Sequence, residues 1–409
     1  MRFLHHYLSG RGTFEGGMKS EYDVIVAGGG PAGAMAAKTA AESGLSVLLV
    51  EKRAEIGVPV RCAEGIIKSD LEEFMQPDQN WISAEIQRGI LIAPDGKKFT
   101  VNCPGVAGYT LDRRRFDKAL VLRAADAGAE VQVKTRAVPL LEDGKVAGAV
   151  LYQNGEEFSV KAKVVIAADG VESQFARHAG VNTTLSLSDV MSCAEYLVAG
   201  IDIDEGANLF YFSQKNAPGG YIWVFSKGKG MANIGIGIPG NLSKDSMRAK
   251  DYLDRFMAEQ YPQGKIIEII TGAVPTAPPL ENAAFDGLLV AGDAAHFSDA
   301  LTGGGIYQAL YSGRLAGETA AAAVKAGDTS ASALAAYDDA WKKSAFGRQL
   351  ELHCFVRDIF RKLSDEELNS LFAPLTDITL DNVTVKATLL AILKHNPKML
   401  LSNPSLLLK

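Results

Sequence analysis

The stretch EYDVIVAGGGPAG, residues 21–33, decides the fold of this chain. Its first half is apolar and β-branched, as expected of a strand that is buried on both faces. An alanine-rich segment follows and predicts a helix that ends at Gly44. A second apolar segment, residues 45–50, completes a β-α-β unit with parallel strands and a right-handed crossover. The turn between strand and helix carries a GxGxxG pattern made by Gly28, Gly30 and Gly33.

In this context the glycine pattern predicts a dinucleotide site. Gly28 permits the tight turn, Gly30 lets the backbone approach a pyrophosphate, and Gly33 allows the helix to pack closely on the strand. The helix N-terminus offers free N–H groups and a positive dipole end to the phosphates. Glu51, at the end of the second strand, can accept hydrogen bonds from ribose hydroxyls. FAD and NAD both use such a unit, so later segments must decide between them.

A second strand–turn–helix arrangement, residues 290–306, favours FAD. The carboxylate of Asp293 suits a hydroxyl of the flavin's ribitol chain. The glycines 303–305 would bring a helix N-terminus against the N1–C2=O edge of the flavin, where negative charge collects on reduction. No second GxGxxG with an acidic partner occurs, so the sequence predicts no stably bound NAD(P)H domain.

Composition excludes several classes of protein. The 409 residues suffice for two or three lobes, and 47% hydrophobic with 22% charged residues is typical of a soluble globular chain. A net charge of -6 argues against a nucleic-acid partner, and no apolar run is long enough to span a bilayer. The four cysteines are scattered without a CxxC pair, which predicts no metal site, no disulfide framework and a cytoplasmic location.

The remaining segments alternate between two kinds of sheet. Residues 163–168 and 287–291 are buried-type strands, whereas the short strand-like segments 86–93, 97–102, 129–134, 145–152, 156–160 and much of 190–275 are typical of antiparallel pairing. We therefore predict an α/β fold in which a Rossmann-like FAD-binding domain is interleaved with an antiparallel β-sheet substrate domain. The predicted limits are 21–85, 106–185 and 281–330 for the first domain, 86–105 and 186–280 for the second, 331–409 for a C-terminal helical region, and 1–20 for a disordered leader, with translation starting at Met1 or Met18.

Several motifs together resemble the para-hydroxybenzoate-hydroxylase-type flavoproteins. They are GGGPAG at 28–33, LDRRRFD at 111–117, ADG at 168–170, and AGDAAH with TGGGI between 291 and 306. RCAEGI at 61–66, GYIWVF at 220–225 and TGGGI are similar to the geranylgeranyl reductase branch, and within it to the archaeal digeranylgeranylglycerophospholipid reductases. The resemblance covers nearly all of residues 21–409.

The resemblance implies a set of FAD contacts. Ala32 and Glu51 would contact the adenosine half, and Ala137 would use its backbone against the adenine. Cys62, Ala63 and Gly65 would line the flavin side. Arg113 would reach the cofactor from a helix that starts near residue 112. The ribitol and isoalloxazine would be held by Asp293, Gly305 and Ile306.

The resemblance also implies an activity. An FAD-dependent reductase of this branch saturates isoprenoid C=C bonds of geranylgeranyl chains in archaeal ether phospholipids, with hydride from N5 of the reduced flavin. The proton could come from a buried water, from Tyr221 or from the flavin's surroundings. Ferredoxin or transient NAD(P)H could supply the electrons. Tyr221, Trp223 and Phe225 alternate on one strand, where they either wall an isoprenoid channel or simply pack the sheet.

Other interpretations remain open at this point. The same scaffold suits an aromatic monooxygenase or halogenase, or an electron-transfer flavoprotein to a quinone. Ser226 and Ala300 stand where the branch often has proline, and both are expected around the substrate cavity. Cys62 is interpreted as a packing residue beside the flavin rather than a catalytic thiol.

The C-terminal tail suggests contact with a membrane surface. Residues 384–409 carry four lysines and no acidic residue, and Val385, Leu389, Ile392 and Leu393 fall on one helical face. Such a segment could lie on an anionic bilayer and admit a lipid substrate. The alternative is an ordinary amphipathic helix packed on the body of the protein.

Overall fold

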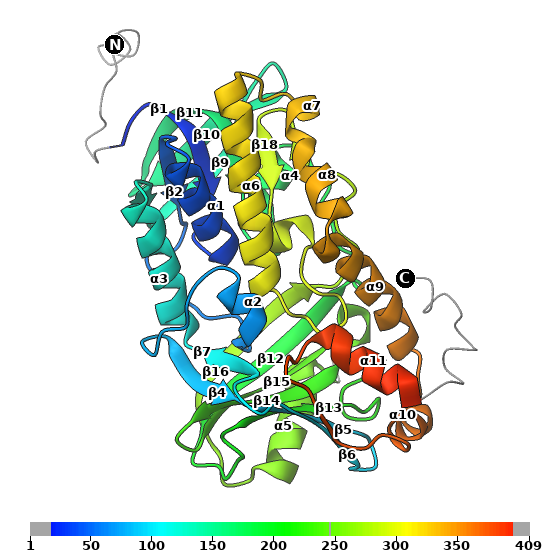
Figure 1. The fold of residues 1–409 in the computed structure, drawn as a ribbon. Coiled ribbons are helices and arrows are strands. Elements are labelled where there is room, and N and C mark those ends of the chain that lie inside the picture. The colour runs from blue at the N-terminus through cyan, green and yellow to red at the C-terminus, as the bar shows by residue number, and fades with distance from the viewer. Residues whose placement is uncertain (1–17, 245–246, 396–409) are drawn as a thin grey trace.

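A computed structural model of the chain describes residues 18–244 and 247–395 (Figure 1). Within these residues the strands form two eight-stranded sheets and one three-stranded sheet. The first large sheet lies in the upper half of Figure 1 and the second in the lower half, and helix α6 (Ile306–Ala326) runs down from the upper half toward the lower. The predicted α/β architecture with a second, antiparallel sheet is therefore present.

The first sheet contains the strand that opens the β-α-β unit. Its order is β17-β18-β11-β1-β2-β8, with β1 pairing in parallel with β11 and β2. The strands are β1 (Glu21–Ala27), β2 (Val47–Val50), β8 (Glu130–Gln132), β9 (Thr135–Glu142), β10 (Lys145–Gln153), β11 (Glu156–Ala167), β17 (Ala284–Phe285) and β18 (Leu288–Val290).

One prediction about this sheet was wrong. The sequence predicted separate strands at 156–160 and 163–168, but β11 is continuous. Its first half pairs with β10 in antiparallel fashion, and its second half pairs with β1 and β18 in parallel. The half-buried first part and the fully buried second part look like two strands in the sequence because their surroundings differ, not because the strand is broken.

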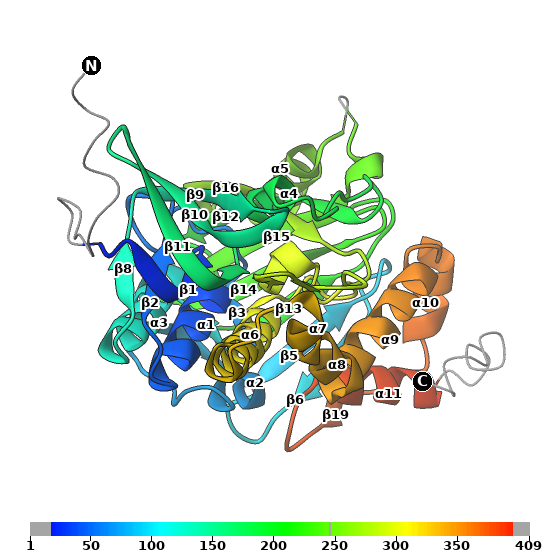
Figure 2. The same cartoon turned by 90° about the horizontal axis from the view of Figure 1, so that it is seen from above.

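Helices α1 (Pro31–Glu42), α3 (Arg113–Asp126) and α6 lie side by side over the first sheet (Figures 1 and 2). A Cβ atom at Gly317 would lie 2.7 Å from the carbonyl oxygen of Ala36, and one at Gly313 would overlap the backbone of Ala32. Glycine at these two positions therefore lets α1 and α6 pack backbone to backbone. This close, parallel packing places the N-terminal ends of both helices at the same end of the sheet.

The second sheet has the order β16-β12-β15-β14-β13-β5-β6-β19. Helix α5 (Ala249–Gln260) packs on one face through Leu253 and Phe256. The strands are β5 (Arg88–Ile92), β6 (Lys98–Asn102), β12 (Val190–Ala199), β13 (Ala207–Tyr211), β14 (Tyr221–Gly228), β15 (Met231–Pro239), β16 (Lys265–Pro275) and β19 (Ile378–Thr379).

A small third sheet lies against the second large sheet, where β4 and β7 contact β14. It contains β3 (Gly65–Ile67), β4 (Ile82–Ile86) and β7 (Gly108–Leu111), and α2 (Lys68–Glu72) follows β3. The predicted strand 86–93 is thus divided: β4 ends in the small sheet and β5 begins in the second large sheet, with Gln87 between them. Short elements α4 (Gln174–His178), η1 (Gly240–Leu242) and η2 (Gly292–Ala295) complete this part of the chain.

The C-terminal region is helical, as predicted, except for β19, which pairs with β6. Figure 2 places its helices along one side of the molecule, next to α6. They are α7 (Ala331–Leu334), α8 (Ala336–Lys343), α9 (Ala345–Phe360), α10 (Asp365–Phe372) and α11 (Val385–His395). No helix among the described residues is long and apolar enough to cross a membrane.

The chain's first described residues are already packed. Met18 is fully buried in the core under the first sheet, three residues before the predicted start of order at Glu21. The rest of the predicted leader lies outside the described residues. The predicted domain limits remain a prediction. The sheets show only that residues 88–102 and 190–275 contribute strands to the same large sheet, which is mainly antiparallel but joins β5 to β13 in parallel.

Candidate active site

A single cavity of about 820 Å³ extends from the strand ends of the first sheet to the face of the second sheet. This volume is in the range of sites that enclose a cofactor or a drug-sized ligand. Twelve of the thirteen predicted FAD contacts line the cavity, and they come from segments far apart in the chain: Gly28, Gly30, Ala32, Glu51, Cys62, Ala63, Gly65, Arg113, Ala137, Asp293, Gly305 and Ile306.

The glycine-rich turn has the shape that a pyrophosphate requires. Gly28 has φ +115°, and a Cβ there would overlap the carbonyl oxygen of Ala168. Gly33 is the one predicted contact that does not line the cavity, and a Cβ at this position would overlap the carbonyl oxygen of Gly28. Gly30 lines the cavity, and a Cβ there would have no protein atom within 4 Å. The turn is therefore tight on the protein side and open on the cavity side, which fits a bound dinucleotide.

The carboxylate of Glu51 is held at the end of β2. It accepts hydrogen bonds from the backbone N–H groups of Gly29 and Arg53, both at 2.9 Å. Ala137 lies on β9 near this end, and Ala32 lies in the first turn of α1. Each carboxylate oxygen can accept more than one hydrogen bond, so ribose hydroxyls could still bind Glu51.

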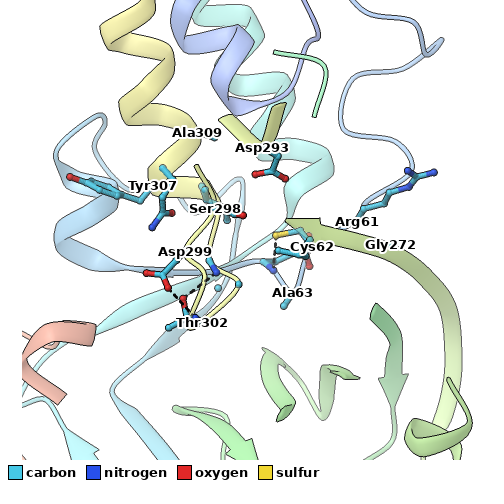
Figure 3. A pocket seen from close by; sticks show the side chains of 18 of the residues that line it. Arg61, Cys62, Ala63, Gly272, Asp293, Ser298, Asp299, Thr302, Tyr307 and Ala309 are labelled. Carbon is cyan, nitrogen blue, oxygen red and sulfur yellow. Dashed lines mark hydrogen bonds between the residues drawn. The ribbon is translucent and has the colours of Figure 1, made fainter. Parts of the chain in front are cut away.

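Asp293 follows β18 in the short helix η2, and its side chain faces the cavity near Cys62 (Figure 3). Burial raises the pKa of Asp293 to about 6, although the positive charge of Arg113 opposes the shift. Arg113 is held by Asp117, with Nε–Oδ1 2.6 Å and Nη2–Oδ2 2.9 Å. A carboxylate that faces the cavity and whose charged form is disfavoured by burial is suited to accept a hydrogen bond from a bound hydroxyl.

The glycine loop before α6 is fixed by Asp299. Its carboxylate accepts hydrogen bonds from the backbone N–H groups of Leu301 and Thr302, both at 3.0 Å. The same carboxylate lies 2.5 Å from Nδ1 of His353, which is fully buried on α9. Burial raises the pKa of Asp299, but the contact with His353 outweighs it and the pKa lies below its usual value. The loop therefore holds the N-terminus of α6 against the cavity.

The segment after Cys62 connects the two halves of the site. Burial raises the pKa of the Cys62 thiol, and Sγ accepts a hydrogen bond from the backbone N–H of Glu64 at 3.2 Å. The thiol therefore stays protonated, as suits a packing residue. Glu64 has φ +73° and accepts from the backbone N–H of Arg113 (2.7 Å), from Nδ2 of Asn233 (2.7 Å) and from Nζ of Lys227.

An aromatic wall lies on the second sheet. Tyr221, Trp223 and Phe225 all line the cavity, and the rings of Tyr221 and Trp223 meet edge to face with centroids 5.9 Å apart. Gly235, opposite Trp223 on β15, leaves the space that the indole occupies, since a Cβ there would overlap the ring. The Tyr221 hydroxyl donates to the carbonyl oxygen of Thr302, so the wall touches the glycine loop. The predicted channel wall is therefore part of the cavity rather than of a closed sheet core.

Three further charged residues line the cavity: half-buried Asp169 of the ADG motif, and buried Glu195 and Arg357, which the sequence analysis did not single out. Asp169 accepts a hydrogen bond from the N–H of Phe175 through one oxygen, while the other has no partner among the described residues. Oε1 of Glu195 and Nη1 of Arg357 are also buried and have no hydrogen-bond partner among the described residues. No group of three or more His, Cys, Asp or Glu side chains in the described ranges is placed to hold a metal ion.

Two expectations about the substrate end need correction or comment. Ala300 lines the cavity, but Ser226 does not: it is fully buried, and its N–H donates to Oδ1 of Asn208 at 3.2 Å. Proline could not donate this hydrogen bond, which accounts for a serine here.

On α11, Val385, Leu389 and Ile392 line the cavity, so this helix packs on the body. The side chain of Leu393 and residues 396–409 lie outside the described part of the tail.

Comparison with known proteins agrees with this geometry. A family model described as geranylgeranyl reductase catalytic domain matches residues 189–274, and one described as FAD dependent oxidoreductase matches residues 23–191. A digeranylgeranylglycerophospholipid reductase of Methanosphaerula palustris is 51% identical over 94% of this chain and 97% of the relative. One of Methanoculleus marisnigri is 50% identical over 94% and 98%.

Solved structures show the same relationship. A geranylgeranyl bacteriochlorophyll reductase-like protein from Thermoplasma acidophilum superposes with a TM-score of 0.91 and 38% identity, over 95% of this chain and 99% of that protein. A flavin-dependent brominase, at 18% identity and a TM-score of 0.68 over 92% and 94%, shares the fold alone. The family predicted from the motifs is confirmed: the chain belongs to the digeranylgeranylglycerophospholipid reductase family and is an FAD-dependent oxidoreductase.

Proposed function

We propose that this enzyme saturates the isolated double bonds of geranylgeranyl chains in archaeal ether phospholipids. The observation that carries the proposal is the continuity of one cavity, which has glycine turns and Asp293 at one end and the aromatic wall at the other. A cofactor at the first end and an isoprenoid chain along the second would meet inside the protein. The relatives named for this reaction support the assignment.

We propose that FAD is held by the residues predicted from the sequence. Gly28, Gly30 and the start of α1 would face the pyrophosphate, Glu51 and Ala137 the adenosine half, and Asp293 with the α6 N-terminus the flavin half. When bound, FAD supplies a two-electron reductant that can transfer hydride to carbon. Electrons would reach it from ferredoxin or transiently bound NAD(P)H, because the sequence contains no second dinucleotide motif.

The protein itself would contribute to catalysis by binding the substrate in an apolar cavity that excludes water and positions the double bond. An unactivated alkene has no carbonyl on which charge could develop, so alignment and exclusion of water must lower the barrier. The part of the cavity beyond Trp223 is lined by aromatic and aliphatic side chains from the second sheet and the C-terminal helices. They include Leu91, Phe210, Phe212, Phe360, Leu368, Phe372, Leu389 and Ile392.

Two arginines at the C-terminal end of α9 suit the phosphate of the lipid headgroup. Arg357 and Arg361, one helical turn apart, both line the cavity. Arg357 is buried and pairs with Asp358 through Nε (2.9 Å) and Nη2 (2.8 Å). Its Nη1 has no hydrogen-bond partner among the described residues, with Asp189 3.7 Å away. Burial and then the charge of Arg357 lower the pKa of Arg361 to about 10. Two crowded cations with unused N–H donors favour an anion, and guanidinium groups match phosphate geometry.

Replacing Arg357 by glutamine is expected to raise KM for a geranylgeranyl phospholipid by about tenfold, because one charge-assisted hydrogen bond to the phosphate is lost. The value of kcat and the KM for an uncharged geranylgeranyl diether should change little. Steady-state kinetics with both lipids checks this. Arg348→Gln is the matched control, because Arg348 is exposed on the same helix and binds the carbonyl oxygen of Lys343. Equal changes in KM for both lipids would contradict a phosphate contact.

We also propose a cytoplasmic location with peripheral contact to the membrane through residues 384–409. Val385, Leu389 and Ile392 line the cavity, and so does Lys386, which is also exposed to solvent. Leu390 and Lys394 follow Lys386 at four-residue intervals on α11 and are exposed as well. A basic outer surface over a lipid cavity suits an anionic bilayer.

Charge reversal at Lys386 and Lys394 should therefore weaken binding to anionic vesicles about 30-fold or more in a flotation assay, because each lysine near the surface contributes about 1 kcal/mol. The matched control reverses Lys145 and Lys325, which are exposed at the opposite end of the molecule in β10 and α6 (Figure 1). Equal flotation of both double variants would remove the proposal of membrane contact.

The proposed reaction can be tested directly. Dithionite-reduced holoenzyme is incubated without oxygen with a geranylgeranyl ether phospholipid, and the lipid is analysed by mass spectrometry. A gain of two hydrogens per double bond is the expected result. A hydroxylated product in air would instead favour a monooxygenase, and unchanged lipid with rapid quinone reduction would favour an electron-transfer flavoprotein.

A further inference from the structure

Glu195 is a buried carboxyl group of the cavity that the proposed function has not used. It lies in the middle of β12, the strand next to the edge strand β16 of the second sheet, and is 3% exposed. Its Oε2 accepts a hydrogen bond from Nε1 of Trp223 at 2.7 Å, whereas Oε1 has no hydrogen-bond partner among the described residues. Glu195 lines the cavity together with Trp223 and Cys193. An unpaired, ionised carboxylate in such surroundings would be costly.

The groups around Glu195 do not neutralise a negative charge there. Lys227 on β14 is engaged by Glu64 and by the carbonyl oxygen of Leu111. Glu268 on β16 is paired with Arg114 at 2.6 Å. Glu195 also interacts with the carboxylate of Glu64 and with the thiols of Cys62 and Cys193. Lys227 is therefore the cation that acts most directly on Glu195, and it is already engaged by Glu64.

These surroundings keep the carboxyl group protonated. Burial raises the pKa of Glu195 to about 8; the hydrogen bond from Trp223 and the charge of Lys227 oppose the shift, and Glu64 adds to it. With Oε2 accepting from the indole, the acidic hydrogen is carried by Oε1. A protonated Glu195 would therefore carry an O–H group that has no acceptor among the described residues. The residue lines the cavity next to Trp223, in the wall along which the isoprenoid is proposed to lie.

We propose that Glu195 is the acid that supplies the proton when a double bond is saturated. This inference rests on the proposed function. The Oε1–H bond breaks and a C–H bond forms at one alkene carbon, while the other carbon receives hydride with its electron pair. The reductant of the proposed function is thereby oxidised, and the ferredoxin or NAD(P)H donor restores it. The Glu195 carboxylate regains its proton from water when the lipid leaves.

Other donors near the cavity are less suitable. The Tyr221 hydroxyl already donates to the carbonyl oxygen of Thr302, and burial raises its pKa. Burial raises the pKa of the Cys193 thiol to about 12. A group that is protonated at neutral pH and titrates close to it is the better general acid, because it can both release and regain its proton.

The decisive variant is Glu195→Gln, in which an amide oxygen can still accept from Trp223 while the acidic proton is gone. Lipid reduction by the reduced holoenzyme should fall about 100-fold or more, with FAD absorbance and lipid binding retained. Glu268→Gln is the control, because Glu268 lies nearby on β16 but does not line the cavity. An active wild type with an equally active Glu195→Gln variant would overturn the inference while leaving the proposed function intact.

A second measurement does not depend on activity. Infrared titration of the wild-type holoenzyme should show a protonated carboxyl band that disappears with a midpoint near pH 8 and is absent from Glu195→Gln. The rate should fall as pH rises through the same midpoint, since only the protonated form donates. In Trp223→Phe, the loss of a hydrogen bond that lowers this pKa should move both midpoints to higher pH. Absence of the band in the wild type would overturn the inference; a wild type that does not reduce the lipid at all would instead overturn the proposed function.

Discussion

Gly30→Val is expected to abolish FAD binding and leave the fold unchanged. A Cβ at Gly30 meets no protein atom within 4 Å, and the backbone there is extended, with φ −77° and ψ −175°. Valine accepts this conformation without strain. Its side chain would occupy the part of the cavity where the backbone must approach a pyrophosphate. We expect FAD affinity to fall by about 100-fold or more, equivalent to about 2.8 kcal/mol.

Gly33→Ala provides the comparison that separates binding from folding. Its Cβ would overlap the carbonyl oxygen of Gly28 and lie 3.2 Å from Cγ1 of Val26, so α1 must move away from β1. Overpacking of this kind costs about 1–3 kcal/mol or more, and the midpoint of thermal unfolding should fall by several degrees. FAD titration and thermal unfolding of both variants check the prediction. A yellow Gly30→Val protein with wild-type FAD affinity would contradict it.

The parts of the site that could be predicted are those encoded by neighbouring residues. The GxGxxG turn, Glu51 and the loop before α6 are each set by a few consecutive residues whose conformation follows from local rules. The aromatic alternation in 221–225 likewise predicted a shared face, and all three rings do line the cavity. What brings these segments together is the packing of α1 on α6, which depends on Gly313 and Gly317 and has no local signature.

The parts that could not be predicted depend on surroundings that are distant in the sequence. Glu64 belongs to a quoted motif, but only its contacts with Asn233 and Lys227 show that it joins the two halves of the site. Glu195 stands in an apolar strand, which was a signal that a charged group is buried. Its raised pKa follows from burial inside the folded sheet, which outweighs the opposing effects of Trp223 and Lys227 on β14. The same holds for β11, whose two halves differ only in their partners.

Asp293→Asn is expected to weaken FAD binding and, at the same time, to stabilise the protein without FAD. The carboxylate is the acceptor proposed for a flavin ribitol hydroxyl, and losing a hydrogen bond to a charged group costs about 1.5–3 kcal/mol. FAD affinity should therefore fall roughly 10- to 100-fold. In the apoprotein the ionised carboxylate lowers the free energy of unfolding, because burial disfavours its charge and raises its pKa from 3.8 to about 6. An amide in the same place carries no charge to desolvate.

The pH dependence of stability tests this explanation. Between about pH 4 and pH 6 the folded apoprotein keeps a proton that the unfolded chain has lost, so wild-type stability decreases as pH rises through this window. Asp293→Asn lacks this titration. Its advantage in the midpoint of thermal unfolding should be largest above pH 6 and should vanish below about pH 4.

Asp251→Asn is the control: it removes the same negative charge, but its expected effect on stability is the opposite one. Asp251 lies in the first turn of α5 and is held by Arg248, whose hydrogen bonds lower the pKa of its carboxyl to about 2. Its ionised form therefore favours the folded state above pH 4, and removing it should lower stability at pH 8. An Asp293→Asn apoprotein that is less stable than the wild type at pH 8 would show that this carboxylate is satisfied by the protein itself, and its proposed role as the acceptor for a flavin hydroxyl would then be lost.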